Sequence, residues 1–188
     1  MEPVTLHTAR LTLRPLSPGD AEAVHRACQD EEVQRWTSVP SPYLREHAEG
    51  FVNRIAPDGW RNDTVYHWGA FTREGDLLAS SVGLSLPGRP GNAEIGYWTA
   101  REHRGHGYTA EAVAAIAHWA FRSLGIQRLE WLAAVGNDAS RAVVARVGFT
   151  FEGTLRGYLD QRGARQDAWV GALLLTDPAA RALAGPYG

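Results

Sequence analysis

Hydrophobic and polar residues alternate near the start of the chain, and the alternation then gives way to a helical pattern. In ARLTLRPLS, polar residues flank Leu11 and Leu13, which is the two-residue period of a half-buried strand. Ser17 and Pro18 follow, and these residue types favour the cap and first turn of a helix. The pattern predicts a strand and then a helix over about residues 18–30.

A second helical region is predicted within SPYLREHAEGFVNRIA. Leu44, Phe51 and Ile55 recur there at roughly helical intervals. The Pro-Asp-Gly segment at 57–59 is expected to end this helix, because proline and glycine disrupt helical bonding. The QRWTSVP stretch, which lies between the two helical regions, is expected to be irregular.

Three strands are predicted in the middle of the chain. The segments TVYHWGAFT, LLASSVGLSL and AEIGYWT are rich in β-branched and aromatic residues. REGD and PGRPGN separate them, and both have turn-forming compositions. Because short turns join antiparallel neighbours, we expect these three strands to pair antiparallel.

Helices and strands alternate in the second half of the chain. A helix is expected over about residues 108–124, followed by a buried strand in RLEWLAAV. NDASRAVVARVG predicts a short helix opened by its Asn-Asp pair, and two strands follow around a hairpin near Gly163. The predicted fold class is mixed α/β, with one sheet of about six or seven strands and helices on both faces. Residues 1–188 are expected to form a single domain.

The composition argues against several classes of function. The chain has 188 residues, is 44% hydrophobic and carries a formal net charge of −2, so no overall basic field favours nucleic acid or an anionic membrane. Cys28 is the only cysteine, which rules out an internal disulfide. The longest apolar stretch, AEAVAAIAHWAF, is interrupted by His118 and is too short to span a bilayer. We expect a cytoplasmic protein, and its oligomeric state stays open, with a homodimer as one option.

A glycine-rich turn, REHRGHGYTAEA, lies between a predicted strand and a predicted helix. The unpaired amides at a helix start and the helix dipole together favour an anion, and a pyrophosphate is the expected ligand. Two glycines would let the backbone approach phosphate oxygens, and basic side chains lie around them: Gly105 and Gly107, with Arg101, Arg104 and His106. The alternative is a solvated turn with incidental basic residues.

The same turn also fits a dinucleotide fingerprint. GHGYTA matches G-x-G-x-x-[GA], so NAD or FAD binding is a competing interpretation. That fingerprint usually opens a chain and is followed by an acidic residue at the end of the next strand, whereas Glu130 lies inside the next strand here. His103 and His106 are close in sequence but have no evident third partner, so no metal site is expected.

Three motifs in order resemble the GCN5-related N-acetyltransferase (GNAT) family, in particular the branch of ribosomal-protein N-terminal acetyltransferases. EIGYWTAREHRGHGYTAEAV resembles the family's acyl-CoA signature, in which a strand leads into a pyrophosphate loop of the form [QR]-x-x-G-x-[GA]. NDASRAVVARVGF, followed by EGTLRGYL, resembles the branch's N-x-x-S…GF signature. The opening TARLTLRPLSPGDAEAV also fits, so the resemblance spans nearly the whole chain.

The resemblance implies acetyl-CoA as the acyl donor. The fourth and fifth strands of the family's sheet splay apart, and here these are AEIGYWT and RLEWLAAV. The pantetheine arm would pair with the backbone in that gap, near Trp98 and Thr99. The implied contacts to the rest of the cofactor are Arg104, Gly105, His106, Gly107, Tyr108, Thr109 and, for the arm or a bound water, Asn137. Glu102 departs from the family's Gln or Arg at the first position of the loop.

Acyl transfer to an amine needs a base for the amine and an acid for the departing thiolate. Glu94 is the base that the resemblance implies. The family often places a tyrosine acid at the position of Val144, so the branch's serine, Ser140, is the candidate acid here. Each has an ordinary alternative: Glu94 as a polar residue that begins a strand, Asn137 as a helix cap, and Ser140 as a first-turn serine.

The resemblance places the acceptor pocket between the first helices and the last hairpin. Trp36, Tyr43 and Asp160 are the candidate substrate-binding residues, and Asp167 is a further acidic residue of that hairpin. The acceptor is expected to be a primary amine, either a protein or peptide N-terminus or a small molecule. The acyl group, acetyl or larger, stays open. A non-catalytic CoA-binding or regulatory module is the alternative from another class.

Overall fold

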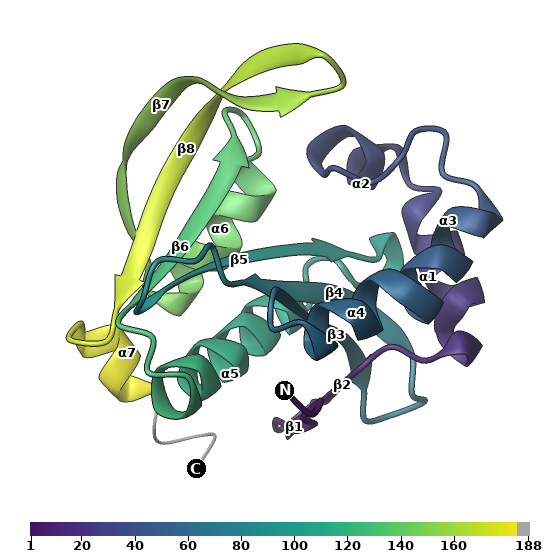
Figure 1. Cartoon of the computed structure of the whole chain (residues 1–188), viewed down its shortest axis with the longest axis horizontal. Coiled ribbons are helices and arrows are strands. Elements are labelled where there is room, and N and C mark those ends of the chain that lie inside the picture. The colour runs from purple at the N-terminus through teal and green to yellow at the C-terminus, as the bar shows by residue number, and fades with distance from the viewer. Residues whose placement is uncertain (184–188) are drawn as a thin grey trace.

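One central sheet organises the computed structural model, which describes residues 1–183 (Figure 1). Within those residues the sheet has eight strands in the order β1-β2-β3-β4-β5-β6-β8-β7. All neighbours pair antiparallel except β5 and β6, which run parallel. The strands are β1 (Leu6–His7), β2 (Leu11–Arg14), β3 (Val65–Thr72), β4 (Leu78–Ser85), β5 (Asn92–Thr99), β6 (Arg128–Ala134), β7 (Thr150–Gln161) and β8 (Ala164–Leu174).

The mixed α/β class predicted from the sequence is confirmed. The three central strands pair antiparallel as expected, and β7 and β8 form a hairpin whose turn contains Gly163. The sheet has one more strand than the predicted six or seven. The additional strand, β1, is only two residues long, so it is too short to show an alternating pattern.

The helices connect the strands and flank the sheet. They are η1 (Pro18–Asp20), α1 (Ala21–Cys28), α2 (Glu31–Trp36), α3 (Arg45–Gly50), the π-helical turn η2 (Phe51–Ile55), α4 (Ala56–Arg61), η3 (Arg101–His103), α5 (Tyr108–Ser123), α6 (Asp138–Val147) and α7 (Pro178–Ala182). Among residues 1–183, no helix has both the length and the apolar character needed to cross a membrane.

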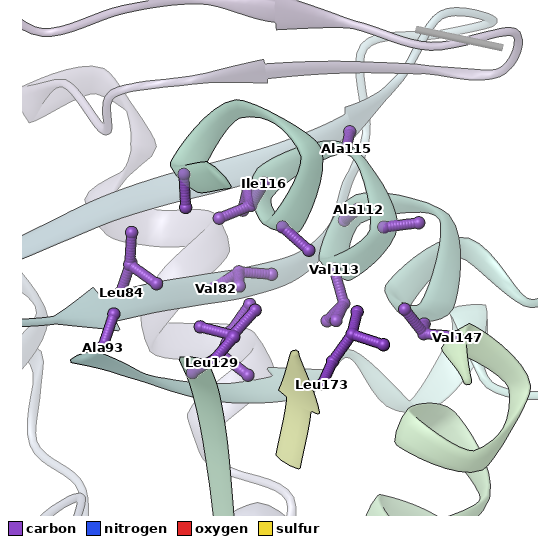
Figure 2. Packing of buried hydrophobic residues seen from close by; sticks show 14 of the residues in the cluster. Val82, Leu84, Ala93, Ala112, Val113, Ala115, Ile116, Leu129, Val147 and Leu173 are labelled. Carbon is purple, nitrogen blue, oxygen red and sulfur yellow. The ribbon is translucent and has the colours of Figure 1, made fainter. Parts of the chain in front are cut away.

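Each face of the sheet carries its own hydrophobic core. On one face, Val113 and Ile116 of α5 pack against Val82, Leu84 and Leu129 of the central strands (Figure 2). All five side chains are fully buried. At about 25 cal/mol per Å² of apolar surface, this layer is a main source of the fold's stability.

The N-terminal helices supply the core of the opposite face. Val24 of α1 and Val52 of η2 join Phe71 and Leu78 in a second buried cluster, and Trp98 packs against it. Phe71 and Leu78 belong to the neighbouring strands β3 and β4. The prediction of helices on both faces is therefore confirmed (Figure 1).

The helix predicted to end at the Pro-Asp-Gly segment continues through it, so that boundary is wrong. The π-helical turn η2 ends at Ile55, and a new α-helical segment, α4, begins at Ala56. Pro57 therefore lies within a continuous helical run, directly after the π-helical turn, and it cannot donate a backbone hydrogen bond to that turn. The helix runs on to Arg61.

The stretch predicted to be irregular contains a helix, so that expectation is corrected in part. Helix α2 ends at Trp36, and its N-cap is Asp30, whose side chain accepts hydrogen bonds from the N–H groups of Glu32 and Val33. The 6 residues of α2 are too few to show a helical period, so the Asp30 cap is the main sequence signal for this helix.

Helix α4 covers the part of β3 that β2 leaves unpaired. Strand β2 pairs only with residues from Gly69 onward, and Trp60 donates from its indole nitrogen to the carbonyl of His67 at 3.0 Å. Gly59 lies so close to this strand that a Cβ would come within 2.2 Å of the carbonyl oxygen of Val65. The helix and the strand edge therefore contact each other through backbone at Gly59.

We predict that Gly59→Ala destabilises the protein, although alanine usually stabilises a helix over glycine by about 0.5–1 kcal/mol. The added methyl group must push the strand away, so Gly59→Ala should lower the free energy of unfolding by roughly 1–3 kcal/mol instead of raising it. Urea unfolding measures this change. Gly50→Ala is the matched control, because a Cβ there meets no atom within 4 Å. Equal stabilisation by both substitutions would refute the close contact.

Candidate active site

The glycine-rich turn forms the start of helix α5. Gly105 and Gly107 have φ values of 81° and 77°, a conformation that favours glycine. The first backbone bond of the helix joins the N–H of Glu111 to the carbonyl of Gly107. The amides of Tyr108, Thr109 and Ala110 precede that bond, so they have no carbonyl partner within the helix. The turn therefore has the geometry of an anion site.

Side chains from other elements hold this turn in place. Arg10 donates to the carbonyl of His106 at 2.9 Å and to the carboxylate of Glu111 at 2.6 Å. Burial alone would raise the pKa of Glu111, but hydrogen bonds from Thr8 and Arg10 outweigh burial and lower the pKa below its usual value. Glu111 therefore stays charged and fixes the turn against β2.

Among the basic side chains near the turn, Arg104 forms an ion pair within the protein. Its guanidinium contacts the Asp30 carboxylate at 2.6 Å, which ties the turn to the N-cap of α2. Arg146 of α6 also lies beside the turn, because a Cβ on Gly107 would be 3.4 Å from its Nη1. No local sequence pattern indicates this role for Arg146, because helix packing brings it there.

The gap next to the turn arises where β5 and β6 part. Three residue pairs join these strands, the last being Glu94 with Glu130, and within residues 1–183 their pairing goes no further. β5 continues to Thr99 beside β4, whereas β6 continues to Ala134 beside β8. The predicted splay between these two strands is confirmed.

The main chain of β5 presents alternate residues to the gap. Trp98 faces β4, since its carbonyl accepts a hydrogen bond from Ser80 at 2.7 Å. Alternate residues of a strand direct their N–H and C=O groups to opposite edges, so Tyr97 and Thr99 face the gap. The Thr99 hydroxyl is 2.6 Å from the Thr109 hydroxyl, which links the gap to the start of α5.

Three side chains form a hydrogen-bond network across the gap. Ser140 Oγ accepts from the indole nitrogen of Trp131 at 3.0 Å and donates to the Tyr97 hydroxyl at 3.1 Å. Tyr97 in turn donates to the main-chain carbonyl of Ser140 at 2.7 Å. Burial raises the pKa of Tyr97, so its phenol keeps the proton. Asn137 caps α6 by accepting from the Ser140 N–H at 3.1 Å, so the Ser140 hydroxyl is not the cap.

Glu94 lies at the point where the two strands separate. It is half-buried and stands next to Glu130, its register partner. Burial and, second, the negative charge of Glu130 raise the pKa of Glu94 above its usual range. A carboxylate with a raised pKa is a stronger base, which is a common property of proton acceptors in active sites.

Helix α2 and the tip of the β7–β8 hairpin meet over the gap (Figure 1). Gln161 donates to the carbonyls of Arg35 and Thr37 at 2.6 and 3.0 Å. Trp36 approaches the loop after β6, because a Cβ on Gly136 would be 3.7 Å from its ring. Trp36 is therefore placed between the hairpin and the gap.

The remaining candidate residues lie in different surroundings. Tyr43 is only 5% exposed and contacts Cys28 in the core of the N-terminal helices, so we leave it out of the proposed acceptor site. Asp160 is exposed near the hairpin tip, opposite Arg165. Val144 is buried in the core, so no side chain projects into the gap from the usual tyrosine position.

A gap between parting strands beside a glycine-rich turn at a helix start is the arrangement expected of an acyl-CoA-dependent transferase. The chain belongs to the GNAT acetyltransferase family, because residues 10–150 match the family described as "Acetyltransferase (GNAT) domain". It is thus an acyl-CoA-dependent N-acetyltransferase of this family, as the motifs predicted. The dinucleotide interpretation is wrong, because the sheet is mixed and the turn follows its fifth strand.

Relatives of known sequence or structure agree with this assignment. The uncharacterized N-acetyltransferase YoaA of Bacillus subtilis is 30% identical over 166 residues, covering 88% of this chain and 93% of YoaA. The ribosomal-protein-serine acetyltransferase of Escherichia coli is 38% identical over 64 residues, 34% of this chain and 36% of that protein. Mycobacterium smegmatis RimJ, solved in complex with CoA-disulfide, has a TM-score of 0.82 at 24% identity and covers 99% of this chain and 98% of its own.

We predict that Gly107→Val weakens CoA binding by roughly 1–3 kcal/mol, because the side chain strains a left-handed residue and fills space in front of the helix amides. Calorimetry with CoA measures the change. Gly88→Val is the control, since Gly88 also has a positive φ of 73° but lies in the β4–β5 turn. Unchanged CoA affinity in a folded Gly107→Val protein would remove this turn from the cofactor site.

Proposed function

We propose that the protein transfers an acetyl group from acetyl-CoA to the primary amine of a protein or peptide N-terminus. The observation that carries this proposal is the gap between β5 and β6, with Glu94 at its closed end and Ser140 on its wall. The similarity to a ribosomal-protein-serine acetyltransferase supports a protein acceptor.

The residues around the gap are suited to hold CoA. The amides of the glycine-rich turn and the Arg146 guanidinium would bind the pyrophosphate, and the Arg104 pair would keep the turn in position. The Tyr97 and Thr99 main chain would pair with the pantetheine arm. The bound thioester would supply an activated acetyl group, and the side-chain N–H groups of Asn137, whose oxygen caps α6, would contact the arm.

Two side chains would move the protons. Glu94 would accept a proton from the neutral attacking amine, directly or through a water, as the new C–N bond forms. The C–S bond would then break as Ser140 donates a proton to the departing thiolate, and the proton held by Glu94 would return to the Ser140 oxygen through solvent. Tyr97 shares a hydrogen bond with the Ser140 hydroxyl and would orient it. The leaving thiol and the amide product carry the same total number of protons as the amine and thioester.

The direct test of this function is thiol release over a panel of amines, with acetyl-CoA and larger acyl-CoA donors. We expect turnover with acetyl-CoA and peptides that have a free N-terminus, and none with the same peptides blocked at the N-terminus. CoA binding without thiol release from any amine would instead identify a non-catalytic CoA-binding module.

We predict that Glu94→Gln lowers turnover by about 10²–10⁴-fold at neutral pH, with CoA affinity unchanged. The defect should shrink as pH rises, because more of the amine is then unprotonated without the help of a base. A pH–rate profile for both proteins measures this difference. Wild-type turnover and an unchanged profile in Glu94→Gln would assign the base to another group.

Stability provides the control for this variant. Because the folded state raises the pKa of Glu94, the ionised carboxylate destabilises the protein above that pKa. Glu94→Gln should therefore raise Tm at neutral pH and have no such effect below about pH 4, where both folded and unfolded carboxyls are mostly protonated. Ser140→Ala is the contrasting variant. Because Ser140 is the proposed acid and not the base, the loss of turnover in this variant should not shrink as rising pH deprotonates the amine.

A further inference from the structure

The indole of Trp131 lies at the point where β6 leaves β5. Within residues 1–183, Glu130 is the last residue of β6 that pairs with β5, so Trp131 is the first residue beyond the parting. Its side chain is only 2% exposed and belongs to the core on the α5 face. From there its ring N–H donates to Ser140 Oγ of α6 at 3.0 Å. A residue of the sheet core therefore contacts the proposed acid directly.

The other two fully buried tryptophans bond their ring N–H groups differently. Trp60 donates to the main-chain carbonyl of His67 at 3.0 Å. Trp68 donates to the main-chain carbonyl of Val4 at 2.9 Å. A carbonyl only accepts, so these two bonds simply satisfy buried donors. Trp131 instead donates to a hydroxyl group, which has a proton of its own to give.

The donors and acceptors of this network leave one proton that can change its partner. The Tyr97 hydroxyl donates to the main-chain carbonyl of Ser140 at 2.7 Å, and a carbonyl cannot return a proton. The Trp131 N–H can only donate, so it makes Ser140 Oγ an acceptor on that side. The Ser140 proton points to the Tyr97 oxygen at 3.1 Å, the longest of these three bonds. The Ser140 proton is therefore the one most easily turned toward a sulfur atom in the gap.

The proposed base and the proposed acid lie on opposite faces of the sheet. Tyr97 packs against the core on the α5 face, whereas the next residue, Trp98, packs against the core of the N-terminal helices. Side chains alternate along a strand, so Glu94, four residues before Trp98, is on the same face as Trp98. Ser140 contacts Tyr97 and is therefore on the α5 face. A thioester in the gap would meet the amine from one face and would release its sulfur toward Ser140 and Trp131 on the other.

We propose that Trp131 is a positioning residue for protonation of the leaving thiolate: its ring N–H orients the Ser140 hydroxyl and stabilises the negative charge that develops on its oxygen. This inference rests on the proposed acetyl transfer. As the C–S bond breaks, its electron pair goes to sulfur, and the Ser140 proton moves to that sulfur. The O–H electron pair stays on Oγ, 3.0 Å from the Trp131 nitrogen, until the oxygen regains through solvent the proton that Glu94 took from the amine. A fixed donor at a site of developing charge is a strong source of catalysis where water is excluded.

The test removes the N–H and keeps the ring. Site-specific replacement of Trp131 by 3-benzothienylalanine puts a sulfur atom in place of the N–H in a side chain of nearly the same shape. Thiol release is measured in single turnovers, with acetyl-CoA and a peptide that has a free N-terminus. We expect this rate to fall by roughly 10–100-fold, the effect of losing a hydrogen bond to a charged group. CoA affinity by calorimetry should be unchanged, and Tm verifies that the variant is folded.

The same replacement at Trp68 is the matched control. It removes an N–H group from a similarly buried indole, whose partner is the carbonyl of Val4 rather than a group of the proposed site. Leaving that buried carbonyl without its donor should lower Tm. The rate of thiol release should stay at the wild-type value, because nothing in the gap has changed.

Ser140→Ala distinguishes this role from simple packing. Without Oγ, the Trp131 N–H has no acid to act on, so its replacement in the Ser140→Ala protein should slow thiol release no further. An equal loss of rate in both backgrounds would assign Trp131 a structural role and overturn the inference. The full wild-type rate in either single variant would also overturn it, and each of these results leaves acetyl transfer intact. Wild-type protein that binds CoA but releases no thiol with any amine would overturn both proposals.

Discussion

The pairing of β5 with β6 ends at Glu94 and Glu130, although the strands on either side of this pair stay joined to their neighbours. A parting inside a sheet leaves backbone N–H and C=O groups without strand partners, and such groups are costly unless a ligand or water satisfies them. The Tyr97 hydroxyl bridges the opening by contacting both the main-chain carbonyl and the hydroxyl of Ser140. This network spans the gap, and the glycine-rich turn and Glu94 are both positioned beside it.

The two faces of the sheet are packed differently. On the α5 face, packing is continuous and every side chain shown in Figure 2 is apolar, so this face mainly supplies stability. On the opposite face, the core of the N-terminal helices includes Phe71 and Leu78 of β3 and β4, whereas Gly96 of β5 is exposed. Both faces therefore contribute to stability, and the face that carries the N-terminal helices also leaves part of β5 exposed.

Long and regular patterns in the sequence predicted most of the fold. Seven strands and α5 were identified because each repeats its period several times, whereas β1, α2 and α7 are too short to do so. The helix end at Pro57 was predicted wrongly, because the sequence alone does not distinguish a proline that ends a helix from one in the first turn of the next helical segment. The π-turn has no known signal in a single sequence, so the true end of that helix could not be placed.

The site was predictable only where it is local in sequence. The glycine-rich turn is one contiguous motif, and the splay followed from the family resemblance rather than from any periodicity. Tyr97, Arg146 and Trp131 were missed, because each gains its role from a partner brought near by folding. A buried tyrosine and a surface tyrosine also look alike in the sequence, so the burial of Tyr43, a candidate substrate-binding residue, could not be predicted.

The contact between the hairpin tip and α2 also has a consequence for the order of folding. Gln161 and Arg162 donate to main-chain carbonyls at the end of α2 and just beyond it, including that of Gln34. A helix of six residues is unstable alone, and these late donors satisfy carbonyls that the helix itself leaves free. We therefore expect α2 to be fully ordered only when the hairpin tip contacts it. Loss of these contacts would loosen α2 and the hairpin tip together.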